Sequence, residues 1–138
     1  MSEKTDYKIL KRAFKHPDRI DRIENLVSCG MPDVNYCING VEGWIEMKSA
    51  IERQRSTSKL LKHKLSQAQM NWFLKQRNAG GNAFILICTE KRWMLMHGHV
   101  ADQINDLTAD HLWQNTVWKS EKPITKEALE ELRVKLTW

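Results

Sequence analysis

Long apolar runs are missing from this 138-residue sequence, which has no stretch near the roughly 20 residues that a helix needs to span a bilayer. The polar start, Met1-Ser2-Glu3-Lys4, also lacks the character of a secretory signal. These absences argue against a membrane protein. We therefore expect a soluble, intracellular protein with no membrane partner.

Cysteine is scarce. The three cysteines, Cys29, Cys37 and Cys88, show no Cys-x-x-Cys spacing, which excludes a disulfide framework and a structural zinc site of the usual kinds. We expect reduced thiols. The one close histidine pair, His97-Gly98-His99, has no cysteine or acidic partner at zinc-like spacing, so a turn is the favoured interpretation.

The sequence also has no repeat, no low-complexity segment and no helix-turn-helix or zinc-finger motif. Its length and its hydrophobic content of 41% suit one domain over residues 1–138. We expect the core at about residues 1–97 and a helical extension at about 98–138. No feature calls for an organic cofactor.

Positive charge is in excess, with a net charge of +5 and a pI near 9.2, which suits DNA as a partner because basic side chains gain affinity by releasing counterions. Residues 53–64 form a basic stretch without an acidic residue, predicted as a mobile DNA-contacting loop although a solvated loop is the alternative: Arg53, Arg55, Lys59, Lys62 and Lys64. A second basic set lies on the polar side of the predicted first helix: Lys8, Lys11, Arg12 and Lys15.

Asn39-Gly40 lies between two runs of alternating apolar residues and predicts a two-residue hairpin turn, since a type I′ turn needs positive φ at both positions. Counting outward from the turn pairs Ile38 with Val41 and, further along the arms, Val34 with Ile45 and Asp33 with Glu46. Two carboxylates opposed in this way lie roughly 5 Å apart at Cβ and repel each other. A divalent cation between them would remove the repulsion.

The two faces of this hairpin differ in polarity, because side chains alternate along a strand. One face is apolar, with Val34, Tyr36, Ile38, Ile45 and Met47; the other is polar, with Asp33, Asn35, Glu46 and Lys48. Carboxylate oxygens are preferred ligands of Mg²⁺, which keeps its remaining positions for water and phosphate. A lysine beside them can orient a metal-bound water, so the pattern predicts phosphodiester hydrolysis.

Pro32-Asp33 and Glu46-Met47-Lys48 together resemble the signature of the PD-(D/E)xK nuclease superfamily. Three further segments are similar to small phage-type nucleases of the virus-type replication-repair group, which are relatives of the Holliday junction resolvases: Arg22-Ile23-Glu24-Asn25, Gly30-Met31-Pro32-Asp33-Val34 and Leu65-Ser66-Gln67-Ala68-Gln69. The resemblance covers about residues 1–97.

The resemblance implies a metal-dependent endonuclease that uses Mg²⁺, with Mn²⁺ as a substitute. It implies that Asp33, Glu46 and the backbone carbonyl of Met47 bind the metal and that Lys48 is the catalytic lysine. Gln69 would be an auxiliary active-site residue, although Ser66-Gln67-Ala68-Gln69 is also a helix capping box. An additional acidic ligand could come from Glu24 or from Glu3, and Glu24 also fits a solvated charge.

The expected order of elements is αβββαββ: a helix at about 4–15, extended chain at 19–27, the hairpin, a helix at 66–78, a buried strand at 84–88 and its partner at 92–96. Helices at about 99–105 and 125–136 follow. This is an α/β fold with a mixed central sheet flanked by helices, which agrees with the restriction-endonuclease-like core that the resemblance implies.

These observations predict an endonuclease that is selective for branched DNA such as a four-way junction. We expect Asn35, on the polar face of the hairpin, to contact the DNA. The alternatives are a nuclease acting on flap, single-stranded or duplex DNA, and a binding protein that does not cut. The resemblance also favours a homodimer, because paired cuts in symmetry-related strands need two active sites.

Overall fold

A six-stranded mixed sheet runs through the computed structural model, which describes residues 3–23, 30–52, 59–61 and 64–138. The strands lie side by side in chain order: β1 (Arg19–Arg22), β2 (Val34–Ile38), β3 (Val41–Ser49), β4 (Asn82–Cys88), β5 (Arg92–His97) and β6 (Trp118–Glu121). β3 and β4 are parallel, and the other neighbouring pairs are antiparallel. A parallel pair needs a crossover connection, which contains α2 (Gln67–Asn78).

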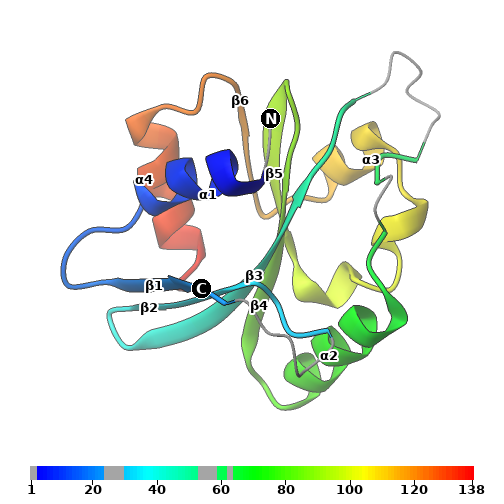
Figure 1. Cartoon of the computed structure of the whole chain (residues 1–138), viewed down its shortest axis with the longest axis horizontal. Helices are drawn as coiled ribbons and strands as arrows, with labels where there is room; N and C mark the ends of the chain where they lie inside the picture. The colour runs from blue at the N-terminus through cyan, green and yellow to red at the C-terminus, as the bar shows by residue number, and fades with distance from the viewer. Residues whose placement is uncertain (1–2, 24–29, 53–58, 62–63) are drawn as a thin grey trace.

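Helices cover both faces of the sheet (Figure 1). One face packs against α1 (Glu3–Lys11) and α4 (Lys126–Lys135), and the other against α2, α3 (Ala109–Gln114) and the short 3₁₀ helices η1 (Gly98–Val100) and η2 (Ile104–Asp106). The structure thus has the expected α/β architecture with a mixed sheet flanked by helices. None of the helices in the described ranges has the length and apolarity for crossing a membrane.

The β4 strand shows why its sequence is apolar at successive positions. Phe84, Leu86 and Cys88 contribute to the core under α1 and α4, whereas Ala83, Ile85 and Ile87 contribute to the core under α2 and α3. A strand covered on both faces buries every side chain, so its apolar residues do not alternate with polar ones. The prediction of a buried strand is confirmed.

The β2–β3 hairpin has the register that the turn signal predicted. Asn39 and Gly40 have φ values of 50° and 81°, as the two-residue turn requires. Ile38 pairs with Val41, and Val34 pairs with Ile45. Five apolar side chains of the two strands are buried on the α1 and α4 side: Val34, Tyr36, Ile38, Ile45 and Met47.

The capping box at the start of α2 is formed as the sequence predicted. The N–H of Gln69 donates to the Ser66 hydroxyl at 3.1 Å, and the N–H of Ser66 donates to Oε1 of Gln69 at 2.8 Å. Two of the unsatisfied N–H groups at this helix end are therefore bonded.

The first helix is shorter than the predicted 4–15, because α1 ends at Lys11. The chain continues with tighter turns, in which the N–H groups of residues 12, 13 and 14 donate to carbonyls three residues earlier. Extended chain was expected over residues 19–27; β1 covers its first part, and residues 24–29 lie outside the described ranges.

The C-terminal part departs most from the prediction. The helix expected at 99–105 is replaced by η1 and η2, α3 was not predicted, and the supposedly helical extension contributes β6 to the sheet edge. Edge position explains why β6 was missed: of its four residues only Trp118 is buried, so its sequence carries almost no apolar signal. The helix expected at 125–136 is confirmed as α4.

The structure describes residues 59–61 and 64 of the predicted mobile basic loop, and the two leucines among them are packed rather than exposed. Leu60 and Leu61 are only 7% and 4% exposed, and the N–H of Leu60 donates to the carbonyl of Leu107 at 3.1 Å. Two adjacent leucines thus anchor this stretch to the α2-side core. Arg53, Arg55 and Lys62 lie outside the described residues.

Candidate active site

Asp33 and Glu46 lie beside each other at the end of the hairpin. Asp33 immediately precedes β2, and Glu46 follows Ile45, the partner of Val34. Oδ1 of Asp33 accepts a hydrogen bond from the backbone N–H of Met47 at 3.0 Å, and its carbonyl accepts one from the N–H of Ile23 at 2.7 Å. Asp33 is therefore held between β1 and β3.

The surroundings of the two carboxyl groups make both less acidic than usual. Burial raises the pKa of Glu46 to about 8, and the negative charge of Asp33 adds to this effect. Burial also raises the pKa of Asp33, against the hydrogen bond from Met47, which lowers it. A pair that is this costly to ionise has a strong demand for positive charge.

Lys48 supplies part of that charge. Its Nζ lies 3.8 Å from Oε2 of Glu46, and its side chain is 14% exposed. The positive charge lowers the pKa of Glu46, but burial and Asp33 outweigh it. A further cation bound beside Asp33 and Glu46 would balance the negative charge that Lys48 leaves uncompensated.

Glu3 lies near enough to act on both acids. It belongs to the first turn of α1, which is fixed to β3 by a 2.7 Å hydrogen bond from the Ser49 hydroxyl to Oδ2 of Asp6. The negative charge of Glu3 raises the pKa of Asp33 and of Glu46. Its competitor as an additional acid, Glu24, lies outside the described residues.

The donor set limits which metal would fit. In the described ranges, no three His, Cys, Asp or Glu side chains gather closely enough to share a metal ion. Two carboxylates without histidine or cysteine suit a hard ion that keeps water ligands, such as Mg²⁺, and do not suit a closed zinc site. The Met47 side chain is buried in the core, so only its backbone is available to such an ion.

Gly30 brings the loop before Asp33 against the first turn of α2. Its φ is +93°, and a Cβ placed there would lie 2.4 Å from the carbonyl oxygen of Ala68, so this position requires glycine. Gln69 follows Ala68 directly and lies at the same turn. Its side-chain oxygen is engaged in the capping box, while its role as an auxiliary active-site residue stays a prediction.

Asn35, expected to contact DNA, has its amide turned to neighbouring strands. It is 7% exposed; its Oδ1 accepts from Nη2 of Arg19 at 2.6 Å, and its Nδ2 donates to the carbonyl of Gly43 at 3.0 Å. Of the basic stretch, Lys59 pairs with Asp106 at 3.1 Å, and Lys64 is exposed. The Asn35 side chain therefore links β2 to β1 and β3, and its contact with DNA stays a prediction.

Arg22 and Tyr7 are two neighbours of the acidic pair that sequence reasoning did not single out. The guanidinium of Arg22 lies 5.7 Å from the centre of the Tyr7 ring and 3.9 Å from Oε2 of Glu3. Burial and the charge of Asp21 raise the pKa of Tyr7, and Asp33 contributes as well. The missing signal was the β1–β2 register, which pairs Arg22 with Val34 and so places it next to Asp33.

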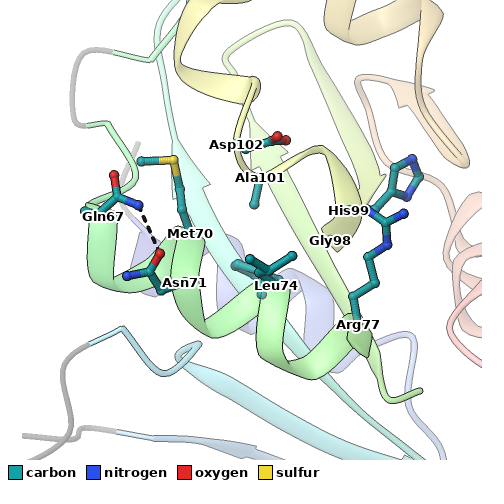
Figure 2. A pocket seen from close by; sticks show the side chains of 10 residues that line it. Gln67, Met70, Asn71, Leu74, Arg77, Gly98, His99, Ala101 and Asp102 are labelled. Carbon is teal, nitrogen blue, oxygen red and sulfur yellow. Dashed lines mark hydrogen bonds between the residues drawn. The ribbon is translucent and has the colours of Figure 1, made fainter. Parts of the chain in front are cut away.

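A separate pocket of about 320 Å³ lies between α2 and η1. Figure 2 shows Met70, Leu74 and Arg77 on α2, facing His99 and Asp102 across the opening. A hydrogen bond of 3.0 Å joins Gln67 to Asn71 along the helix at its margin. None of the predicted site residues that the structure describes lines this pocket, so it is distinct from the acidic pair.

Comparison with known proteins supports the fold. No family model matches the chain, and no curated protein is significantly similar to it in sequence. A solved structure does match: Hjc of Archaeoglobus fulgidus, a Holliday junction resolvase, with a TM-score of 0.50 and 17% identity over 72% of this chain and 78% of that chain. This chain shares the restriction-endonuclease-like fold of Hjc. At such identity the similarity is one of fold, and it agrees with the architecture expected from the sequence.

Proposed function

We propose that this protein is a metal-dependent DNA endonuclease of the PD-(D/E)xK type, close to the small phage-type replication-repair nucleases and the Holliday junction resolvases. The observation that carries the proposal is the buried Glu46 beside the partly buried Asp33, with Lys48 at 3.8 Å from Glu46. The pair occupies the end of a hairpin whose register is fixed by its apolar face.

In this proposal Asp33 and Glu46 hold Mg²⁺ or Mn²⁺, with the carbonyl of Met47 as a further ligand by resemblance to the superfamily. The bound ion would polarise the phosphate and lower the pKa of a water molecule. Lys48 orients that water from beside Glu46 and offsets negative charge on the phosphate. Glu3 adds negative charge that favours a cation at this place.

Branched DNA is the proposed substrate. The net charge of +5 supports a polyanionic partner, and the fold is shared with a protein described as a Holliday junction resolvase. The sequence has no motif that reads base edges, which suits recognition of DNA shape and backbone. We also propose a homodimer, and the exposed Trp138 after α4, with 70% of its surface accessible, is a candidate contact.

The decisive experiment is cleavage of end-labelled four-way junction, flap, single-stranded and duplex DNA with Mg²⁺, with Mn²⁺ and with EDTA. Asp33→Asn keeps the shape of the side chain and removes its charge, and Glu130→Gln, an exposed change on α4, is the matched control. We expect metal-dependent, symmetric cuts in the junction that Asp33→Asn abolishes and Glu130→Gln retains. Binding without cutting in every metal would refute the endonuclease.

A further inference from the structure

Arg22 lies across from Val34, the residue that follows Asp33. The β1–β2 register pairs Arg22 with Val34, and the next N–H, of Ile23, donates to the carbonyl of Asp33 at 2.7 Å. The distance of 3.9 Å to Glu3 is too long for a hydrogen bond. Within the described ranges, the Arg22 guanidinium therefore donates no hydrogen bond to another residue.

Two cations lie close to the Tyr7 ring. The Arg22 guanidinium lies 5.7 Å from the ring centre and the Lys11 ammonium lies 5.8 Å from it. The ring itself is partly buried and packs against the core beneath α1, so its position is fixed. Attraction between each cation and the ring restrains both long side chains. A ligand that binds them therefore has to order them less, and the entropy lost on binding is smaller.

We propose that Arg22 and Lys11, positioned by the Tyr7 ring, bind a backbone phosphate adjacent to the scissile phosphate. The ligand is the DNA backbone, so this inference rests on the proposed function and adds a second contact point for the substrate strand. A guanidinium that donates no hydrogen bond to a residue in the described ranges suits a phosphate, which it can bind through two parallel hydrogen bonds. One strand would thus run from the acidic pair, past β1, to the outer side of α1.

Two acidic side chains near the Tyr7 ring, Glu3 and Asp21, would repel a phosphate only weakly. Glu3 draws on Arg22 only at 3.9 Å, and its side chain is 40% exposed, so solvent screens much of its charge. Asp21, the other acid close to Tyr7, is engaged with Arg19.

The test neutralises one DNA phosphate at a time. Junction DNA with a single methylphosphonate at each of the positions flanking the cleavage site is titrated with protein in Ca²⁺ or EDTA, and affinity is read by fluorescence anisotropy. For wild type we expect one adjacent position to lose roughly tenfold in affinity, which corresponds to about 1.4 kcal/mol. Arg22→Gln should bind more weakly and be insensitive to neutralisation at that position.

Three further variants sharpen the result. Lys126→Gln, which removes an exposed positive charge from α4, should keep the wild-type pattern. Tyr7→Phe should also keep it, whereas Tyr7→Leu should reduce the sensitivity because the ring no longer gathers the cations. If Arg22→Gln remains as sensitive as wild type at every position, the phosphate site is refuted. Cleavage assays on the same proteins report separately on the endonuclease, so either proposal can fail alone.

Discussion

The buried carboxyl of Glu46 gives a testable link between the candidate active site and stability. Its pKa of about 8, against 4.5 for the exposed group, means that the folded protein resists ionisation of this side chain. Each unit of pKa corresponds to about 1.36 kcal/mol. In the absence of metal, the raised pKa of Glu46 should therefore lower the free energy of unfolding, relative to a side chain that cannot ionise. The loss should be roughly 3 kcal/mol at pH 7 and less than about 1 kcal/mol at pH 5.

The sign follows from proton binding. Between the unfolded pKa of 4.5 and the folded pKa of about 8, the folded state holds a proton that the unfolded state has lost. Stability must then fall as the pH rises through this window and level off above it. Glu46→Gln cannot ionise, so the variant should be more stable than wild type by roughly 2–3 kcal/mol at pH 7, with a much smaller difference at pH 5.

Urea unfolding of wild type and Glu46→Gln at pH 5, 6, 7 and 8 in EDTA measures this difference by linear extrapolation. Mg²⁺ should then stabilise wild type at pH 7, by about 2.7 kcal/mol at a hundredfold excess over its dissociation constant, and leave Glu46→Gln nearly unchanged. A difference between the two proteins that does not grow from pH 5 to pH 7 would refute the burial argument. Equal stabilisation of both by Mg²⁺ would remove Glu46 from the metal site.

Other variants test neighbouring contacts. Lys48→Met should lower the single-turnover cleavage rate by roughly 100-fold or more while binding of DNA persists, and a rate near wild type would remove Lys48 from the chemistry. Ser66→Ala should cost about 1 kcal/mol of stability through the lost cap and leave cleavage unchanged; Gln69→Ala should cost a similar amount, and a further loss of cleavage would assign Gln69 an auxiliary role. Glu52→Gln weakens a partly buried pair with Arg92, whose Nε and Nη2 donate at 3.0 and 2.8 Å, and should destabilise the protein by about 1.5–3 kcal/mol in urea without affecting cleavage.

Local signals in the sequence predicted the part of the fold that carries the acids. The Asn39-Gly40 turn determined the hairpin register, the apolar run of β4 determined a strand covered on both faces, and Ser66 marked the start of α2. Each signal depends on residues close together in the chain. β6 and α3 could not be predicted in this way, because they are short and gain their stability from contacts with β5 and with the core.

The surroundings of the acidic pair depend on contacts between distant segments, and sequence patterns do not give these. Glu3 and Tyr7 approach Asp33 because α1 lies against Arg22 at the end of β1 and is tied to β3 through Asp6. Arg22 stood in a stretch of alternating charges that is typical of an exposed face, and only strand pairing reveals its place. Neighbours of this kind can be identified only once the fold is known.

The hairpin register explains how the protein tolerates a buried glutamate, Glu46, beside the partly buried Asp33. A slip of one residue would turn Glu46 into the core beneath α1 and α4 and would place Met47 on the acidic face. The five apolar side chains buried on that core side favour the observed register strongly. Packing on one face of the hairpin therefore stabilises, on the other, an arrangement of charge that is unfavourable by itself. A cation bound there would remove this repulsion, and the free energy so released would favour its binding.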